Sequence, residues 1–123
     1  MIDSVLVVEG NEKQQRALCD LVQQKGYTVH GICSLDQAVP EAAFGGYQVV
    51  IVDLDLVPLS NLELRELKRA NPGASLLVMS SRAFHPELRE AMREHIDVCL
   101  SKPVDPDELA YWLRSFHRNR QHV

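Results

Sequence analysis

Apolar and polar positions alternate in blocks along this chain. Five short, largely aliphatic runs stand at positions 5–8, 28–32, 49–52, 76–79 and 98–100. Runs of this length, rich in β-branched residues, are typical of strands buried on both faces of a parallel sheet. In the segments between them, apolar residues recur every three or four positions, as on one face of a helix. The pattern therefore predicts five strands that alternate with five helices.

Capping residues mark where the helices begin. Four helices are predicted to follow side chains that accept a hydrogen bond from the first turn, namely Asn11, Ser34, Ser60 and Asp105. The other helix is expected to begin at Pro86, because proline is favoured at the first helical position. Pro40 should shorten or bend the second helix, since it cannot donate the helical hydrogen bond. The predicted core stripe of the last helix is Leu109, Trp112, Leu113 and Phe116.

The alternation of strands and helices predicts an α/β fold, with a five-stranded parallel sheet covered on both faces and joined by right-handed crossovers. A chain of 123 residues can bury one core and is too short for two. Its hydrophobic content of 46% is typical of a globular protein. Only the arginine- and histidine-rich segment after Phe116 is expected to be a tail or the start of a linker.

Charge and cysteine usage narrow the environment and the partners. The net charge of −4 argues against direct binding of nucleic acid. The three cysteines are widely spaced and odd in number, which is typical of a reducing cytoplasm. No apolar run approaches the roughly 18 residues of a membrane span, and no leader-like segment precedes the first run. We therefore expect a soluble cytoplasmic protein without a membrane partner.

Chemically active side chains gather at the C-terminal ends of the predicted strands. They are Glu9 after the first strand, Asp53 and Asp55 after the third, Ser80 and Ser81 after the fourth, and Lys102 after the fifth. Because these ends share one edge of a parallel sheet, the side chains should converge there. Carboxylates hold a hard cation or act as a nucleophile, and a hydroxyl and an ammonium neutralise phosphoryl oxygens. The set predicts a phosphoryl-transfer site.

Some of these residues have plainer explanations. Asp55 is as readily explained as an ordinary acid on a surface loop. Ser81 competes with Ser80 for the role of the site hydroxyl, and either could be a turn former. His85 and His95 are ten residues apart and do not share a helix face, so we expect them on the surface rather than on a metal.

Four motifs, in order, resemble the response-regulator receiver domain, the CheY-like family. They are LVVEGN, VVIVD, LLVMSS and LSKP, and the resemblance extends from about Ser4 to Phe116. It implies a receiver domain over residues 1–117, with 118–123 as a basic tail or linker start. It also implies the flavodoxin-like, doubly wound (βα)5 fold with strand order 2-1-3-4-5 that is known for CheY.

The resemblance implies a role for each matching residue. Asp53 would accept a phosphoryl group from a histidine kinase, a histidine phosphotransfer protein or a small phosphodonor. Ser80 would be the hydroxyl that turns toward the phosphoryl group, and Lys102 the lysine that pairs with it. Glu9 would be the first acid of the pair that supports Mg²⁺, with Asp53 as a ligand and Asp55 as another through its backbone carbonyl.

Three positions depart from the family pattern. Gly10 stands where the second acid of the pair is expected, and Cys99 stands where an aromatic ring usually reports phosphorylation. The proline usual four residues after the acceptor is displaced to Pro58, with Val57 in its place. Pro103 keeps the family's proline after the lysine, often reached through a cis peptide bond.

These departures shape the expected function. We expect a receiver that relays a signal to an output domain or partner protein, is not an enzyme, and is a monomer or weak dimer. Its magnesium site should be functional but weak, with the Asp55 carboxylate partly replacing the acid missing at Gly10. Gly10 and Cys99 also favour an alternative, a pseudo-receiver that binds partners without phosphorylation.

A second alternative is a haloacid-dehalogenase-type phosphohydrolase. The stretch VVIVDLDLV matches the nucleophile motif of that class, with Asp55 as general acid–base. In that class the motif normally lies on the first strand, whereas here two strand–helix units precede it. The hydrolase is therefore the less favoured of the two alternatives.

Overall fold

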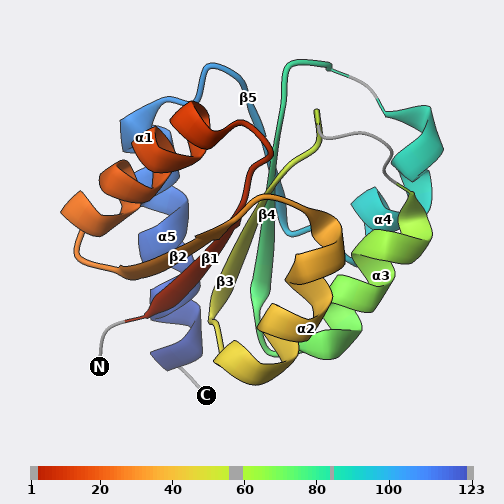
Figure 1. The fold of residues 1–123 in the computed structure, drawn as a ribbon, viewed down its shortest axis with the longest axis horizontal. Coiled ribbons are helices and arrows are strands. Elements are labelled where there is room, and N and C mark those ends of the chain that lie inside the picture. Colours follow the sequence, from red (N-terminus) through yellow and green to blue (C-terminus); the bar gives the residue numbers. More distant parts are fainter. Residues whose placement is uncertain (1–2, 56–59, 84, 122–123) are drawn as a thin grey trace.

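The structure is a computed structural model that describes residues 3–55, 60–83 and 85–121. In chain order the elements are β1 Ser4–Val8, α1 Glu12–Gln24, β2 Thr28–Ile32, α2 Leu35–Gly45, β3 Val49–Asp53, α3 Asn61–Ala70, β4 Ser75–Ser80, the 3₁₀ helix η1 Pro86–Leu88, α4 Arg89–Glu94, β5 Val98–Ser101 and α5 Pro106–Gln121 (Figure 1). Each of the five predicted strands is present, and its ends agree with the prediction to within one residue.

The five strands form one parallel sheet in the order β2-β1-β3-β4-β5. Helices α1 and α5 cover one face of the sheet, and α2, α3 and α4 cover the other (Figure 1). This is the doubly wound arrangement and the strand order that the resemblance implied. The order reverses between β1 and β3, which is where open α/β sheets bind ligands at their carboxyl edge.

Two apolar layers hold the helices on the sheet. Val5, Val7 and Ile51 pack with α1 and α5, whereas Leu6 and Val52 pack with α2, α3 and α4. Successive residues of a strand point to opposite faces, so a run without polar interruptions supplies both layers. All five residues of β3 are buried. β3 is the central strand of the sheet, so its C-terminal end lies in the middle of the carboxyl edge.

Local capping explains several helix starts. The Asn11 side chain accepts a hydrogen bond from the backbone N–H of Gln14 at 2.9 Å. Ser60 and Glu63 form a reciprocal capping box at the start of α3. The Asp105 carboxylate accepts from the backbone N–H of Asp107 at 2.9 Å. These three starts were predicted from the sequence and are confirmed.

Other helical details differ from the prediction. Pro40 lies inside α2, which nevertheless continues to Gly45, so the proline does not shorten the helix. Pro86 begins a 3₁₀ turn, and the α-helix itself begins at Arg89. Helix α5 continues to Gln121, through positions where we expected a tail. Val57 and Pro58, which carry one departure from the family pattern, lie outside the described residues.

Among the described residues, no helix is both long enough and apolar enough to cross a lipid bilayer.

Candidate functional site

The register of the sheet brings the predicted site residues to one edge. Val8 of β1 lies beside Val52 of β3, so Glu9 and Asp53 follow at the same level. Asp53 lies beside Met79 of β4, one residue before Ser80. Ser80 in turn lies beside Ser101 of β5, which Lys102 follows. The parallel pairing therefore determines which side chains are neighbours.

Asp53 is the last residue of β3 and is only 2% exposed. Its Oδ2 accepts a hydrogen bond from Nζ of Lys102 at 2.7 Å. Its Oδ1 accepts one from the backbone N–H of Asp55 at 2.9 Å. Each carboxylate oxygen thus has a donor, which satisfies a buried charge that would otherwise be costly.

Lys102 contacts a second acid as well. Its Nζ lies 3.0 Å from Oδ2 of Asp55, whose Oδ1 accepts from the backbone N–H of Ser81 at 3.3 Å. Burial lowers the pKa of Lys102, but its hydrogen bonds to Asp53 and Asp55 outweigh burial and raise it. For Asp55, burial raises the pKa, and the hydrogen bonds from Lys102 and Ser81 lower it by more. The peptide bond from Lys102 to Pro103 is cis, as the resemblance implied.

Glu9 is the second buried acid of the site, with 3% of its surface exposed. Its Oε1 accepts a hydrogen bond from the backbone N–H of Asn11 at 3.0 Å. Burial and a hydrogen bond with Asp53 raise the pKa of Glu9 to about 7, although the Asn11 N–H and the charge of Lys102 oppose them. Two carboxyl groups in a buried space hold a proton more readily than one.

This pair of acids fits a divalent cation. Mg²⁺ is usually held by one or two carboxylates, with waters and phosphate oxygens completing its octahedron. Glu9 and Asp53 can supply two such ligands, and a cation would favour the ionised form of Glu9, whose pKa is raised first by burial and then by the neighbouring Asp53. The Asp55 carboxylate is a neighbour of this pair through Lys102, to which it binds.

A different set of side chains has the tightest geometry for a metal. Among the described residues, the set whose ligand atoms all lie within 4.8 Å of one another is Glu90, Glu94 and His95 on and after α4. Both glutamates are exposed, so this is an acidic surface group of a common kind. Glu9, Asp53 and Asp55 do not converge this closely in the structure.

Ser80 is buried and Ser81 is exposed, which separates the two candidate hydroxyls. Ser80 Oγ accepts from the backbone N–H of Arg82 at 2.9 Å and lies 2.6 Å from Nε2 of His85. The resemblance implied a hydroxyl that turns toward the phosphoryl group. In this structure its hydrogen bonds go to the loop after β4.

The prediction that His85 is a surface residue is wrong. His85 is 5% exposed and belongs to the small set of buried polar residues, with Glu9, Asp53 and Ser80. Nothing in the apolar periodicity marked it, and its hydrogen-bond partner Ser80 lies at the end of another element, β4. His95 is partly buried. Phe116 is buried and Trp112 packs beside it, which confirms the predicted core stripe of α5.

Comparisons with known proteins agree with this architecture. A family model described as the response regulator receiver domain matches residues 5–114. The chain is 29% identical, over 112 residues, to the uncharacterized transcriptional regulatory protein YkoG of Bacillus subtilis, and the match covers 90% of this chain and 49% of that protein. The chain spans about half the length of the curated relatives it matches.

Two solved structures show the same fold. A CheY-like response regulator receiver domain protein from Methanospirillum hungatei has a TM-score of 0.88 and 14% identity, with 100% of each chain covered. The signal receiver domain of an HD domain-containing protein from Pseudomonas fluorescens has a TM-score of 0.87 and 22% identity, again with 100% of each chain covered. At these identities the likeness speaks for the fold alone.

Proposed function

Because the chain belongs to the response-regulator receiver family of two-component signalling systems, we propose that Asp53 accepts a phosphoryl group from a histidine kinase or a histidine phosphotransfer protein. The observation that carries this proposal is the geometry at Asp53. A buried carboxylate at the carboxyl edge of the central strand lies 2.7 Å from the Lys102 ammonium, with a second buried acid, Glu9, beside it.

The proposed step is a phosphoryl transfer. A carboxylate oxygen of Asp53 forms a bond to phosphorus as the bond from phosphorus to the donor's nitrogen or oxygen breaks, and the leaving group keeps that electron pair. The Lys102 ammonium, which now binds a carboxylate oxygen of Asp53, would instead bind an oxygen of the transferred phosphoryl group. It would then neutralise the negative charge on that group. Glu9 and Asp53 would hold Mg²⁺, which supplies further neutralisation of the phosphoryl oxygens.

The proposal includes the role of the domain in a longer protein. Family membership makes the chain a signalling module, and the curated relatives are transcriptional regulatory proteins about twice its length. We therefore propose that an output domain or partner protein reads the state of Asp53. The receiver domain is proposed to span residues 1–117, as a cytoplasmic monomer or weak dimer that does not itself bind nucleic acid.

One specific observation favours the pseudo-receiver as a second candidate. Gly10 contributes no side chain to the acidic pair, so a cation would be held by fewer carboxylates than in the family pattern. In a pseudo-receiver, Asp53 would not be phosphorylated, and its contact with Lys102 would be a structural ion pair. The family match leaves the haloacid-dehalogenase-type hydrolase without support.

Acetyl phosphate with magnesium tests the proposal, with intact mass as the readout. We expect one phosphoryl group on the wild type, none on Asp53→Asn, and one on the matched control Asp20→Asn, at an exposed position of α1. Retention of the label by Asp53→Asn would refute Asp53 as the acceptor. An unlabelled wild type at tens of millimolar magnesium, beyond the roughly millimolar range of weak cation sites, would favour the pseudo-receiver. Turnover of a phosphate ester would instead indicate a hydrolase.

A further inference from the structure

His85 lies where the loop after β4 enters η1, five residues after Ser80. Its side chain is 2% exposed, although histidine is usually found only partly buried. A buried imidazole requires hydrogen-bond partners, and the structure supplies them from the end of β4 and from the loop that follows it. Ser80 Oγ lies 2.6 Å from Nε2, and the Arg82 carbonyl oxygen lies 3.2 Å from it.

The direction of these hydrogen bonds follows from what each atom can do. A carbonyl oxygen only accepts, so its approach to Nε2 favours the tautomer with the proton on Nε2, an assignment that rests on the network. With that tautomer the single Nε2 proton is shared between Ser80 Oγ and the Arg82 carbonyl oxygen, and Ser80 Oγ also accepts from the backbone N–H of Arg82. Both donors belong to the loop, and among the described residues none of the hydrogen bonds recorded for Ser80 Oγ goes to Asp53, Asp55 or Lys102.

We propose that His85 is a positioning residue that holds the Ser80 hydroxyl toward the loop while Asp53 is unphosphorylated. The inference rests on the proposed function, because an acyl phosphate on Asp53 is the anion that would compete for Ser80. Because Ser80 Oγ accepts these hydrogen bonds, its own proton stays available, and it is the position of the oxygen that opposes the switch. His85 and the Arg82 N–H hold Oγ on the side of the loop, and it must rotate away from them to donate to that anion. The hydrogen bond to His85 therefore opposes the switched state, and its loss accompanies the switch.

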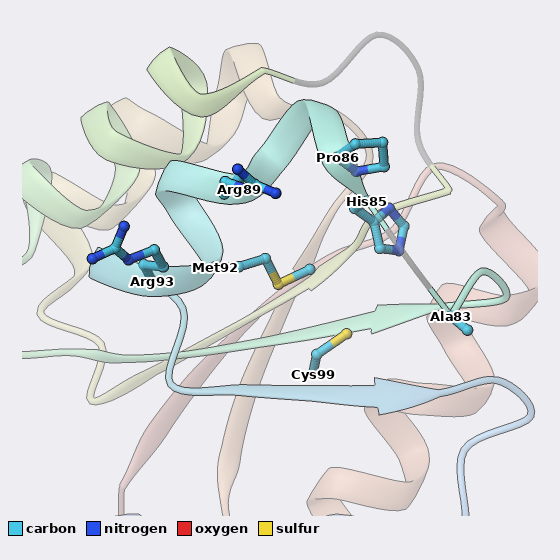
Figure 2. A pocket seen from close by; sticks show the side chains of 7 residues that line it. All are labelled: Ala83, His85, Pro86, Arg89, Met92, Arg93 and Cys99. Carbon is cyan, nitrogen blue, oxygen red and sulfur yellow. The ribbon is translucent and has the colours of Figure 1, made fainter.

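His85 lies beside an open groove into which its imidazole ring can move. Figure 2 shows His85 at one end of a groove between α4 and β5, with Met92 and Cys99 facing each other across it. The groove has a volume of about 470 Å³. Cys99 is a small residue, so no bulky side chain from β5 fills the space beside the imidazole. Rotation of the Ser80 side chain away from His85 can thus allow the imidazole to move, and the imidazole forms part of the wall of this exposed groove.

Nitrogen NMR of the histidine ring tests the contact in the free protein, without any phosphoryl analogue. We expect the Nε2 resonance of His85 to move in Ser80→Ala and to stay in place in Ser81→Ala, the neighbouring exposed hydroxyl. An Nε2 resonance that is unchanged in Ser80→Ala would overturn the inference. The NMR comparison tests the contact between Ser80 and His85 even if the protein binds no phosphoryl analogue. Failure to bind such an analogue would refute the proposed function and would leave this contact unaffected.

Titration with beryllofluoride and magnesium tests the coupling to Asp53. We expect His85→Leu to bind beryllofluoride about threefold to tenfold more tightly than wild type, the equivalent of one net hydrogen bond. His85→Gln, whose amide can still reach Ser80, should restore an affinity near that of wild type. In a Ser80→Ala background the gain from His85→Leu should vanish. Equal affinity in His85→Leu and wild type, or a gain that persists without the Ser80 hydroxyl, would contradict the proposal. If His85→Leu does not fold, the NMR comparison of Ser80→Ala decides the question.

Discussion

The Lys102 ammonium and the Asp53 carboxylate are 49 residues apart in the sequence and 2.7 Å apart in the structure. Lys102 has 22% of its side chain exposed and Asp53 has 3%, so water screens the pair only weakly. The same ammonium holds Asp55 at 3.0 Å. One cation therefore serves two carboxylates, with the third acid, Glu9, close to Asp53.

Removal of the Lys102 charge should destabilise the domain at neutral pH. Lys102→Met leaves Asp53 and Asp55 without their cation, and we expect the free energy of unfolding to fall by about 1–3 kcal/mol. The loss should shrink as the pH is lowered, because protonated carboxyl groups need no cation. Urea unfolding measures it, with Lys13→Met on the exposed face of α1 as the matched control. A loss no larger than that of the control would show that the contact contributes little.

Glu9 should make the metal-free domain less stable as the pH rises. Its pKa is about 7 in the folded protein against an ordinary 4.5, so the folded state keeps a proton that the unfolded state releases. The free energy of unfolding therefore decreases between about pH 4.5 and 7, by at most a few kcal/mol, and stays at the lower value above that range. Glu9→Gln should remove this slope and be the more stable protein at pH 8. Parallel pH profiles of the two proteins in a chelator would contradict the raised pKa.

Magnesium binding should respond to the acids at the edge of the sheet. Gly10→Asp adds a carboxylate next to Glu9 and should tighten magnesium binding by about tenfold, the effect of about 1.4 kcal/mol. Asp55→Ala should weaken binding if this carboxylate partly replaces the missing acid. Affinity should also rise with pH up to about 7, because Glu9 must lose its proton to act as a ligand. Titration in the presence of beryllofluoride measures all three effects, and unchanged affinity in Asp55→Ala would exclude the compensation.

The Asn61 side chain connects α3 to the η1–α4 segment, and its removal should destabilise the domain. Its Nδ2 donates to the Glu87 carbonyl at 3.2 Å, and its Oδ1 accepts from the Ala91 N–H at 2.9 Å, so one amide holds two backbone groups of the η1–α4 segment. Asn61→Ala should lower unfolding stability by about 1–2 kcal/mol. Hydrogen exchange of the Ala91 amide should accelerate in the same variant. Leu62→Ala, at an exposed position in the same turn, is the control; equal protection of Ala91 in both variants would contradict the role of Asn61.

Sequence alone determined the local elements of this protein. Runs such as residues 49–52 have few polar interruptions, and burial on two faces is the favourable way to cover them, so the strands were predicted to within one residue. The capping box of Ser60 and Glu63 involves groups three residues apart, so its formation requires no tertiary contact. The candidate acids, hydroxyl and lysine were found because strand ends are visible in the sequence.

The family resemblance supplied what periodicity could not. Strand order depends on pairing between segments far apart in the chain, and the alternation of strands and helices is compatible with more than one order. Four motifs in sequence pointed to the order 2-1-3-4-5, which the structure confirms. Pro40 does not end α2, which continues to Gly45 without the hydrogen bond that proline cannot donate.

Only the tertiary structure decided how the site is arranged. The burial of His85 and the direction of the Ser80 hydroxyl depend on how the loop after β4 folds back onto the strand end. The raised pKa of Glu9 depends on its burial beside Asp53, a residue on another strand. Short-range preferences choose helices, strands and caps, whereas burial and charge are set by neighbours that meet only when the sheet is assembled.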